Sequence, residues 1–282
     1  MSPRVFFTGA TGCVGGPTLS LLTRIFPHIS IHALRTPQKA KIFQVNYPNI
    51  TCVIGDLDSY DVLRAEAAEA DLILHCADAN HEAETLTLLN GLASKENDLE
   101  KGTFIHSSGA ASLLDLNTID DHLGEPAAKL YSDTRDAETV FNFSPDRVHV
   151  AIKRRVIFIG VRTLIFSPAQ IMGVGSSVGK EETYTDDYPK AVLKQGHAFI
   201  LGKGQGIWSS SSVGDAAAAI ALVVGEALRG SKSKPTFGKY GYYFIESGAV
   251  TMQICTESPF TPAASSRNLS QNLILSQLES NH

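Results

Sequence analysis

Long apolar runs and clusters of like charge are missing from this sequence. A membrane-spanning helix needs about 18 or more apolar residues in a row, and the apolar run behind Arg4 is too short even for a signal peptide. The net charge of −5 and the pI near 6.0 provide no basic surface for nucleic acid or anionic lipid. We therefore expect a soluble, cytoplasmic protein that binds neither nucleic acid nor a membrane.

Cysteine is also scarce. The four cysteines, Cys13, Cys52, Cys76 and Cys255, lie far apart and form no C-x-x-C pair. Zinc sites and disulfide frameworks need closer and more regular spacing, so we predict neither a metal site nor a disulfide. This cysteine usage is typical of a reducing compartment.

Short apolar runs alternate with longer amphipathic stretches through the first part of the chain. This alternation is typical of βαβ units, in which parallel strands are joined by right-handed helical crossovers. With 43% apolar residues, the 282-residue chain can bury such a core. The sequence predicts an α/β fold with a doubly wound parallel sheet, the Rossmann fold. The predicted strands are 5–7, 29–34, 50–54, 72–76 and 103–106, and the predicted helices are 14–25, 38–45, 62–68 and 82–93.

From Gly124 onward the pattern is weaker, and it predicts only a strand at 162–166, a helix at 215–228 and a short strand at 242–244. We divide the chain into a Rossmann core at 1–166 and a small C-terminal substrate lobe at 167–255, interleaved with the last core elements. The segment 256–282 is rich in Ser, Asn, Gln and Thr, which predicts a weakly ordered tail.

A glycine-rich turn joins the first predicted strand to the first predicted helix. Gly9, Gly12 and Gly15 have the spacing G-x-x-G-x-x-G. Such a turn brings backbone N–H groups and the positive end of a helix against a pyrophosphate, so it predicts a nicotinamide-cofactor site. The alternative is an ordinary βα loop that contains glycine. The residues predicted to bind the cofactor here are Thr8, Gly9, Thr11, Gly12, Cys13, Val14 and Gly15.

The second predicted strand ends without a carboxylate. Proteins that bind NAD place Asp or Glu there to hold the ribose hydroxyls, whereas this strand ends in Arg35, 20 residues beyond Gly15. A guanidinium can hold a 2′-phosphate with two hydrogen bonds. The sequence therefore favours NADP(H) over NAD, with Lys39 as a second candidate cation. The alternative for Arg35 is a solvated surface residue.

The glycine spacing resembles that of extended and atypical short-chain dehydrogenases/reductases. The segments 75–78, 105–109, 131–133 and 241–244 resemble fungal NAD(P)-binding proteins near the NmrA-like and epimerase/dehydratase branches. This resemblance covers about residues 4–248. It implies a loop beside the adenine, a loop under the ribose, and segments beside the nicotinamide. The residues carried over to these roles are Asp56 and Leu57, then Cys76, Ala77 and Asp78, and then Ser107 and Pro168.

Two of these residues have simpler interpretations. Asp56 could equally be a loop residue that caps the next helix. Cys76 is expected to be an inert buried thiol, because the sequence implies no base beside it.

The resemblance also implies a catalytic tyrosine, a lysine four residues later that lowers its pKa, and a serine that orients the substrate oxygen. Tyr131 and Ser108 are the candidates, but Arg135 stands at the lysine position and Gly109 at the serine position of an ungapped match. An arginine cannot reproduce the contact of a compact ammonium with the ribose. Alternatively, Tyr131 lies in a surface loop and 147–157 is the helix that faces the sheet.

The leading hypothesis is an NADPH-dependent oxidoreductase that acts on a small carbonyl or enone substrate. The glycine at the serine position and the missing lysine favour a second hypothesis, a non-catalytic NADP(H)-binding redox sensor of the NmrA-like kind. A sugar-nucleotide epimerase or dehydratase is a third. Downstream, Ser212 replaces a histidine of the family pattern, and Asp215 is expected to be the N-cap of the alanine-rich helix.

Overall fold

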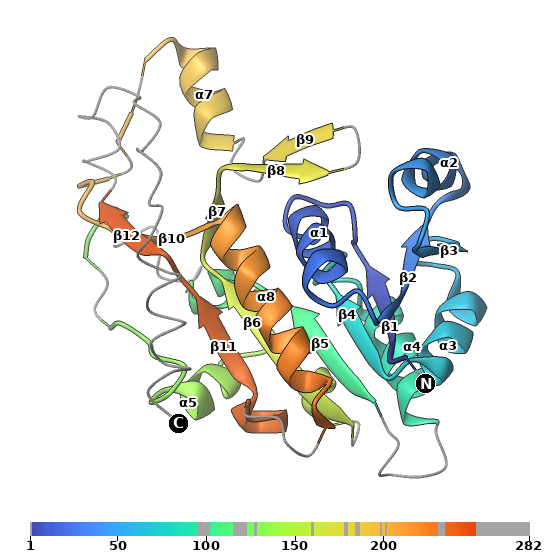
Figure 1. Ribbon diagram of the computed structural model, residues 1–282. Helices are drawn as coiled ribbons and strands as arrows, with labels where there is room; N and C mark the ends of the chain where they lie inside the picture. The colour runs from blue at the N-terminus through green and yellow to red at the C-terminus, as the bar shows by residue number, and fades with distance from the viewer. Residues whose placement is uncertain are drawn as a thin grey trace, which may run out of the picture.

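A computed structural model describes the chain at residues 2–94, 102–114, 123–126, 129–158, 161–177, 180–183, 187–197, 199–200, 202–230 and 235–251. Its centre is a seven-stranded parallel sheet in the order β11-β6-β5-β4-β1-β2-β3 (Figure 1). This is the doubly wound Rossmann arrangement that the sequence predicts. The strands are β1 (Arg4–Thr8), β2 (Ser30–Arg35), β3 (Thr51–Ile54), β4 (Leu72–His75), β5 (Thr103–Ser107), β6 (Arg162–Pro168) and β11 (Tyr242–Ile245).

Helices cover both faces of this sheet, and the central strands are therefore apolar on both sides. In β1, Val5 and Phe7 point into one core cluster and Phe6 into the other, and all three are fully buried. The first cluster lies under α1 (Gly15–Ile25), α2 (Pro37–Asn46) and α8 (Val213–Ala227). The second lies under α3 (Tyr60–Glu69), α4 (Glu82–Ala93), α5 (Ala137–Phe141) and α6 (Val150–Phe158).

A smaller lobe follows β6. It contains a three-stranded sheet in the order β12-β10-β7, a two-stranded hairpin and a helix, and Figure 1 shows it beyond the carboxyl end of the main sheet. The sequence patterns did not predict these elements. They are β7 (Gln170–Met172), β8 (Val174–Ser177), β9 (Lys180–Thr183), α7 (Asp187–Gln195), β10 (Ile207–Ser212) and β12 (Gly248–Thr251).

The chain then returns to the main sheet, because β11 pairs in parallel with β6. This confirms the predicted strand at 242–244. Two 3₁₀-helices complete the described elements, at Ala110–Leu113 and Gly238–Tyr240. The predicted tail at 256–282 lies outside the described residues.

Helix α2 begins at Pro37, one residue before the predicted start at 38, because the fixed φ and missing N–H of proline are both tolerated at the first helical position. The predicted N-cap of α8 is wrong. Asp215 was expected to cap α8, but the Ser212 hydroxyl accepts the hydrogen bond from the Asp215 N–H at 2.9 Å and is the N-cap.

Candidate functional site

The direction of the connections reverses at β1, which lies between β2 and β4 in the sheet. In open α/β sheets, ligands bind at the carboxyl ends of the strands beside such a point. Here those ends carry the glycine turn after β1 and the 76–78 loop after β4.

Two glycines of the turn are required by the packing of the backbone. Gly9 has a φ of +76°, and a Cβ on it would lie 2.3 Å from the Cys76 carbonyl oxygen and 2.6 Å from the Ala77 nitrogen. A Cβ on Gly15 would lie 2.0 Å from the Gly9 carbonyl oxygen. Gly12 differs, because among the described residues a Cβ on it would come close only to the Gly9 oxygen, at 3.5 Å. The turn is therefore tight where it meets β4 and α1, and open at Gly12.

Helix α1 begins directly after this open position. Its N-cap Val14 makes no side-chain capping hydrogen bond, and the first turn contains no acidic residue. The positive end of the helix dipole is thus not offset by a side chain of its own first turn, which is the electrostatic arrangement that suits an anion. Thr8, also predicted to contact the cofactor, is fully buried at the end of β1.

Arg35 lies against the glycine turn. Its side chain donates a hydrogen bond from one terminal nitrogen to the Thr11 hydroxyl, and the other terminal nitrogen lies 3.3 Å from the Leu34 carbonyl oxygen. The guanidinium also lies over the ring of Phe43, 5.3 Å from its centroid. Only 8% of the residue is exposed. The alternative of a solvated surface arginine is therefore wrong.

The small strand on the lobe side also touches the turn. A Cβ on Gly175 of β8 would lie 2.1 Å from the carbonyl oxygen of Cys13. Contact this close is available only to glycine, so the lobe and the turn meet backbone against backbone.

The residues predicted to lie beside the adenine occupy the loop after β3. The Asp56 carboxylate accepts hydrogen bonds from the Ser59 hydroxyl at 2.7 Å and from the Asp58 N–H at 3.1 Å, and these bonds hold the pKa of Asp56 below its usual value. Asp56 is exposed, and Leu57 packs partly against the core. The carboxylate thus shapes the loop, and its contact with adenine stays a prediction.

The loop after β4 approaches the glycine turn. The Cys76 N–H donates to the Thr8 carbonyl at 3.0 Å, and the Asp78 carboxylate accepts from the Asn80 N–H at 2.9 Å. Burial raises the pKa of the Cys76 thiol to about 12. Cys76 is only partly buried, and its inertness stays a prediction.

Ser107, Ser108 and Gly109 follow β5, and Pro168 ends the neighbouring strand β6. The Ser108 N–H donates to the Phe166 carbonyl at 2.7 Å. The Ser108 hydroxyl oxygen is buried and has no hydrogen-bond partner among the residues that the structure describes.

Tyr131 does not lie on a helix, so it and Arg135 do not share a helix face. Its ring packs edge-on against Phe143, with centroids 5.3 Å apart, and the ammonium of Lys129 lies 4.7 Å from its centroid. The helix that precedes β6 is α6, which agrees with the alternative that 147–157 faces the sheet. Tyr131 as an acid/base stays a prediction.

Helix α6 carries two residues that the sequence patterns missed. His149 directly precedes the helix, with a left-handed φ of 64°, and Lys153 follows one turn later with its N–H bonded to the His149 carbonyl at 3.1 Å. The pair has the four-residue spacing expected of a catalytic tyrosine and its lysine. That spacing, searched with histidine in place of tyrosine, was the available signal.

His149 faces the loop after β5. Its Nδ1 lies 2.8 Å from the Asn80 Oδ1, and its Nε2 would lie 3.0 Å from a Cβ on Gly109. Burial lowers the pKa of this imidazole below its ordinary value; the Lys153 cation lowers it further and Asp78 opposes the change.

Lys153 is fully buried, and burial lowers its pKa to about 8, with a smaller effect from Arg154. The ammonium lies 4.7 Å from the centroid of the Tyr242 ring. Within the described part of the chain it has no hydrogen-bond partner.

Two buried histidines lie beneath this group. The rings of His75 and His106 stack with centroids 4.9 Å apart, and their Nδ1 atoms are 2.8 Å apart. A carboxylate oxygen of Glu84 lies 3.2 Å from the Nε2 of His75. Burial holds the pKa of His106 well below its ordinary value, and the neighbouring His75 and His149 lower that pKa further. At a separation of 2.8 Å, one of the two Nδ1 atoms donates a hydrogen bond to the other.

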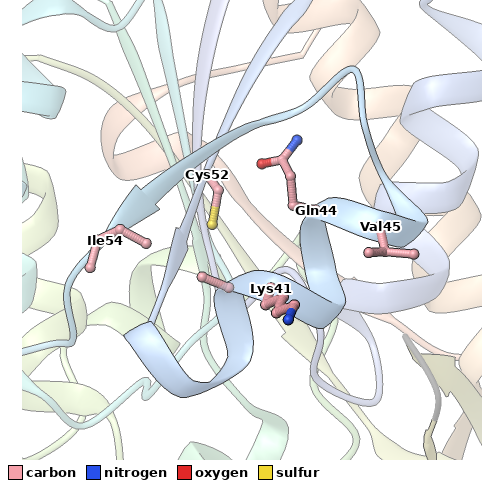
Figure 2. A pocket seen from close by; sticks show the side chains of 6 residues that line it. Lys41, Gln44, Val45, Cys52 and Ile54 are labelled. Atoms are coloured by element: carbon pink, nitrogen blue, oxygen red, sulfur yellow. The ribbon is translucent and has the colours of Figure 1, made fainter.

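A shallow pocket lies elsewhere, between α2 and the edge strand β3. Figure 2 shows Cys52 and Ile54 of the strand facing Lys41, Gln44 and Val45 of the helix. None of these residues is a predicted site residue, and none belongs to the glycine turn.

Among the described residues, no helix is both long and apolar enough to cross a membrane. The chain has a doubly wound Rossmann fold, with the glycine turn at the reversal point of the sheet. No family model matches the sequence. A curated relative, the oxidase ucsJ from an Acremonium species, is 26% identical over 262 residues, which is 88% of this chain and 75% of the relative.

Solved structures agree on the fold. A dTDP-glucose 4,6-dehydratase from Bacillus anthracis, in complex with NAD, aligns with a TM-score of 0.61 and 14% identity over 91% of this chain and 79% of its own. A UDP-glucose 4-epimerase from Thermotoga maritima aligns with a TM-score of 0.58 and 14% identity, over 89% of this chain and 79% of its own. An NADPH-dependent quinone oxidoreductase from Escherichia coli, in complex with NADPH, aligns with a TM-score of 0.56 and 18% identity, over 88% of this chain and 71% of its own.

Proposed function

We propose that the protein is an NADPH-dependent oxidoreductase that acts on a small carbonyl or enone. The observation that carries this proposal is the position of Arg35, buried against Thr11 of the glycine turn. A cation at this end of β2 matches a 2′-phosphate, whereas a carboxylate there would match the free ribose hydroxyls of NAD.

The geometry of the turn fits a dinucleotide. The space in which a Gly12 side chain would lie is open, and α1 begins beside it with an N-terminus that no side chain caps. In this proposal the segment from Thr8 to Gly15 holds the pyrophosphate and Arg35 holds the 2′-phosphate. The residues proposed for the remaining contacts are Asp56, Leu57, Cys76, Ala77, Asp78, Ser107 and Pro168.

The bound cofactor would supply a hydride, and the chain would orient the substrate and move its proton. Ser108 is proposed to orient the substrate oxygen, because its hydroxyl is buried near the end of β5 without another partner in the described residues. Tyr131 is the acid/base that the family resemblance proposes. Its ring packs against Phe143 outside any helix, so this role rests on the resemblance alone.

A redox sensor that binds NADP(H) without turnover is the second candidate. It is favoured by Gly109 at the serine position and by the absence of a helical partner for Tyr131. The epimerase and dehydratase neighbours share only the fold with this chain, at 14% identity. They give no support to an epimerase or dehydratase reaction here. The scattered cysteines support a cytoplasmic location.

Titration of the purified protein with NADPH, followed by cofactor fluorescence, tests the binding step. We expect micromolar binding that is tighter for NADPH than for NADH. Steady-state turnover with a panel of small ketones, enones and secondary alcohols then separates the two candidates. Binding with turnover supports the enzyme, binding without turnover supports the sensor, and no binding refutes both.

A further inference from the structure

We propose that His149 is the catalytic base of this site, with its Nε2 accepting the hydroxyl proton of an alcohol substrate. This inference rests on the proposed oxidoreductase function and deepens it. It assigns to a histidine the role that the resemblance gives to a tyrosine, and it defines the substrate class as a small alcohol and its carbonyl product.

The backbone places the imidazole at the site. His149 lies at the start of α6, the helix between β5 and β6, and its Nε2 faces the loop at the carboxyl end of β5. Its φ of 64° is uncommon for a residue with a side chain. Such a conformation is strained for a residue with a Cβ and is concentrated at functional sites.

The hydrogen bond at Nδ1 selects the tautomer. The Oδ1 of Asn80, 2.8 Å away, is an amide oxygen and can only accept, so Nδ1 carries the proton. The lone pair is then on Nε2, the nitrogen that faces Gly109. A histidine held in this way is a base at Nε2.

Gly109 now has a physical explanation. A Cβ at this position would come within 3.0 Å of the imidazole nitrogen, so any side chain there would crowd the base. The residue that departs from the family pattern thus leaves space beside Nε2. In this proposal, the substrate oxygen occupies that space.

The charges around His149 favour the neutral ring. Lys153 approaches from α6, Asp78 from the loop after β4 and His106 from β5. Burial and the Lys153 cation lower the imidazole pKa below 6.5, while the Asp78 carboxylate opposes them. At neutral pH the ring is therefore unprotonated and ready to accept a proton.

The reaction balances as a two-electron oxidation. The substrate hydroxyl loses its proton to Nε2, and the carbinol carbon loses a hydride to the nicotinamide of NADP⁺. The C–O single bond becomes a carbonyl, and NADP⁺ is reduced to NADPH. In the reverse direction, the imidazolium returns the proton to the oxygen of the carbonyl substrate.

The first test replaces His149 by glycine, which tolerates the positive φ without strain. We expect the NADPH dissociation constant to change less than threefold and turnover of 1-phenylethanol or cyclohexanol with NADP⁺ to fall about 100- to 10,000-fold. Added imidazole should restore part of the lost rate. Rescue separates a missing base from a disturbed fold, and H149N, which also accepts this φ, should remain inactive without being rescued.

His28→Gly, the same replacement at an exposed histidine outside the proposed site, is the matched control, and we expect it to retain turnover within about threefold. Tyr131→Phe tests the competing assignment, because the resemblance gives the acid/base role to Tyr131. A large loss in Y131F together with retained activity in H149G would overturn the proposal. An H149G protein that is inactive and not rescued by imidazole would also overturn it.

Nitrogen-15 NMR of His149 in the cofactor-free protein supplies a readout that needs no turnover. We expect a proton on Nδ1 and a pKa below 6.5, and K153M should raise that pKa because it removes a nearby cation. A proton on Nε2 in the neutral ring, or no response to K153M, would refute the assignment. If wild-type protein does not bind NADPH, the proposed function itself fails. If it binds NADPH but oxidises no alcohol, the sensor hypothesis stands and the base is refuted.

Discussion

Replacement of Arg35 by alanine should separate NADPH from NADH. If the guanidinium makes two charge-assisted hydrogen bonds to the 2′-phosphate, each contributes about 1.5 kcal/mol or more. Their loss of about 3 kcal/mol corresponds to a roughly 150-fold weaker dissociation constant for NADPH. NADH has no 2′-phosphate, so its binding should change less than about threefold.

The same substitution affects the protein itself. Arg35 is 8% exposed, bonds the Thr11 hydroxyl and lies over Phe43. Loss of these contacts should lower the free energy of unfolding by about 1–2 kcal/mol. Denaturant unfolding of R35A without cofactor measures this cost separately from binding.

Two controls make the experiment specific. T11V removes the hydroxyl that Arg35 contacts and keeps the guanidinium, so preference for NADPH over NADH should survive. K39A removes an exposed cation on α2 and should weaken NADPH binding by less than about tenfold, as expected for a solvent-screened charge. Isothermal titration calorimetry with both cofactors is the assay. Equal losses of NADPH and NADH affinity in R35A would refute the role of Arg35.

Three further predictions concern the turn and the buried groups near it. G9A should be destabilised by several kcal/mol in denaturant unfolding, because its Cβ would meet the Cys76 backbone at a positive φ. G12A should fold normally and lose NADPH affinity. A stable G9A protein would contradict the packing argument. The Cys76 thiol, with a pKa of about 12, should resist iodoacetamide in the native protein at pH 7, as peptide mass spectrometry can check, and rapid native labelling would count against it. Lys153 has a pKa lowered from 10.5 to about 8, so the unfolded chain binds more protons between these values and wild-type stability should rise with pH there, by up to about 3 kcal/mol. K153M should lack that rise and be more stable at pH 7, and equal pH slopes for the two proteins would contradict the burial argument.

The sheet could be predicted from the sequence because its strands are buried on both faces. Runs such as Val5-Phe6-Phe7 have no polar residue, and each is followed by a helix with its own apolar face. The lobe could not be predicted in this way. Strand β10 reads Ile-Trp-Ser-Ser-Ser-Ser, in which neither an alternating nor a continuous apolar pattern is present.

The candidate site was predictable where backbone spacing determines it. The glycine turn and Arg35 are each placed by one strand and its following residues, so their proximity follows from parallel pairing of β1 with β2. His149 was missed because it comes from a helix more than 40 residues beyond β5, with a weak sequence pattern between them. Its approach to Gly109 depends on tertiary packing that no local periodicity records.

The contact between Gly175 and Cys13 has a consequence for the order of events during turnover. The outer lobe touches the phosphate-binding turn through main-chain atoms, with no flexible side chain between them to absorb a displacement. A cofactor that shifts the turn by even a fraction of an ångström must therefore shift β8 as well. For the proposed oxidoreductase, we therefore expect compulsory-order kinetics, with the nucleotide binding first and leaving last.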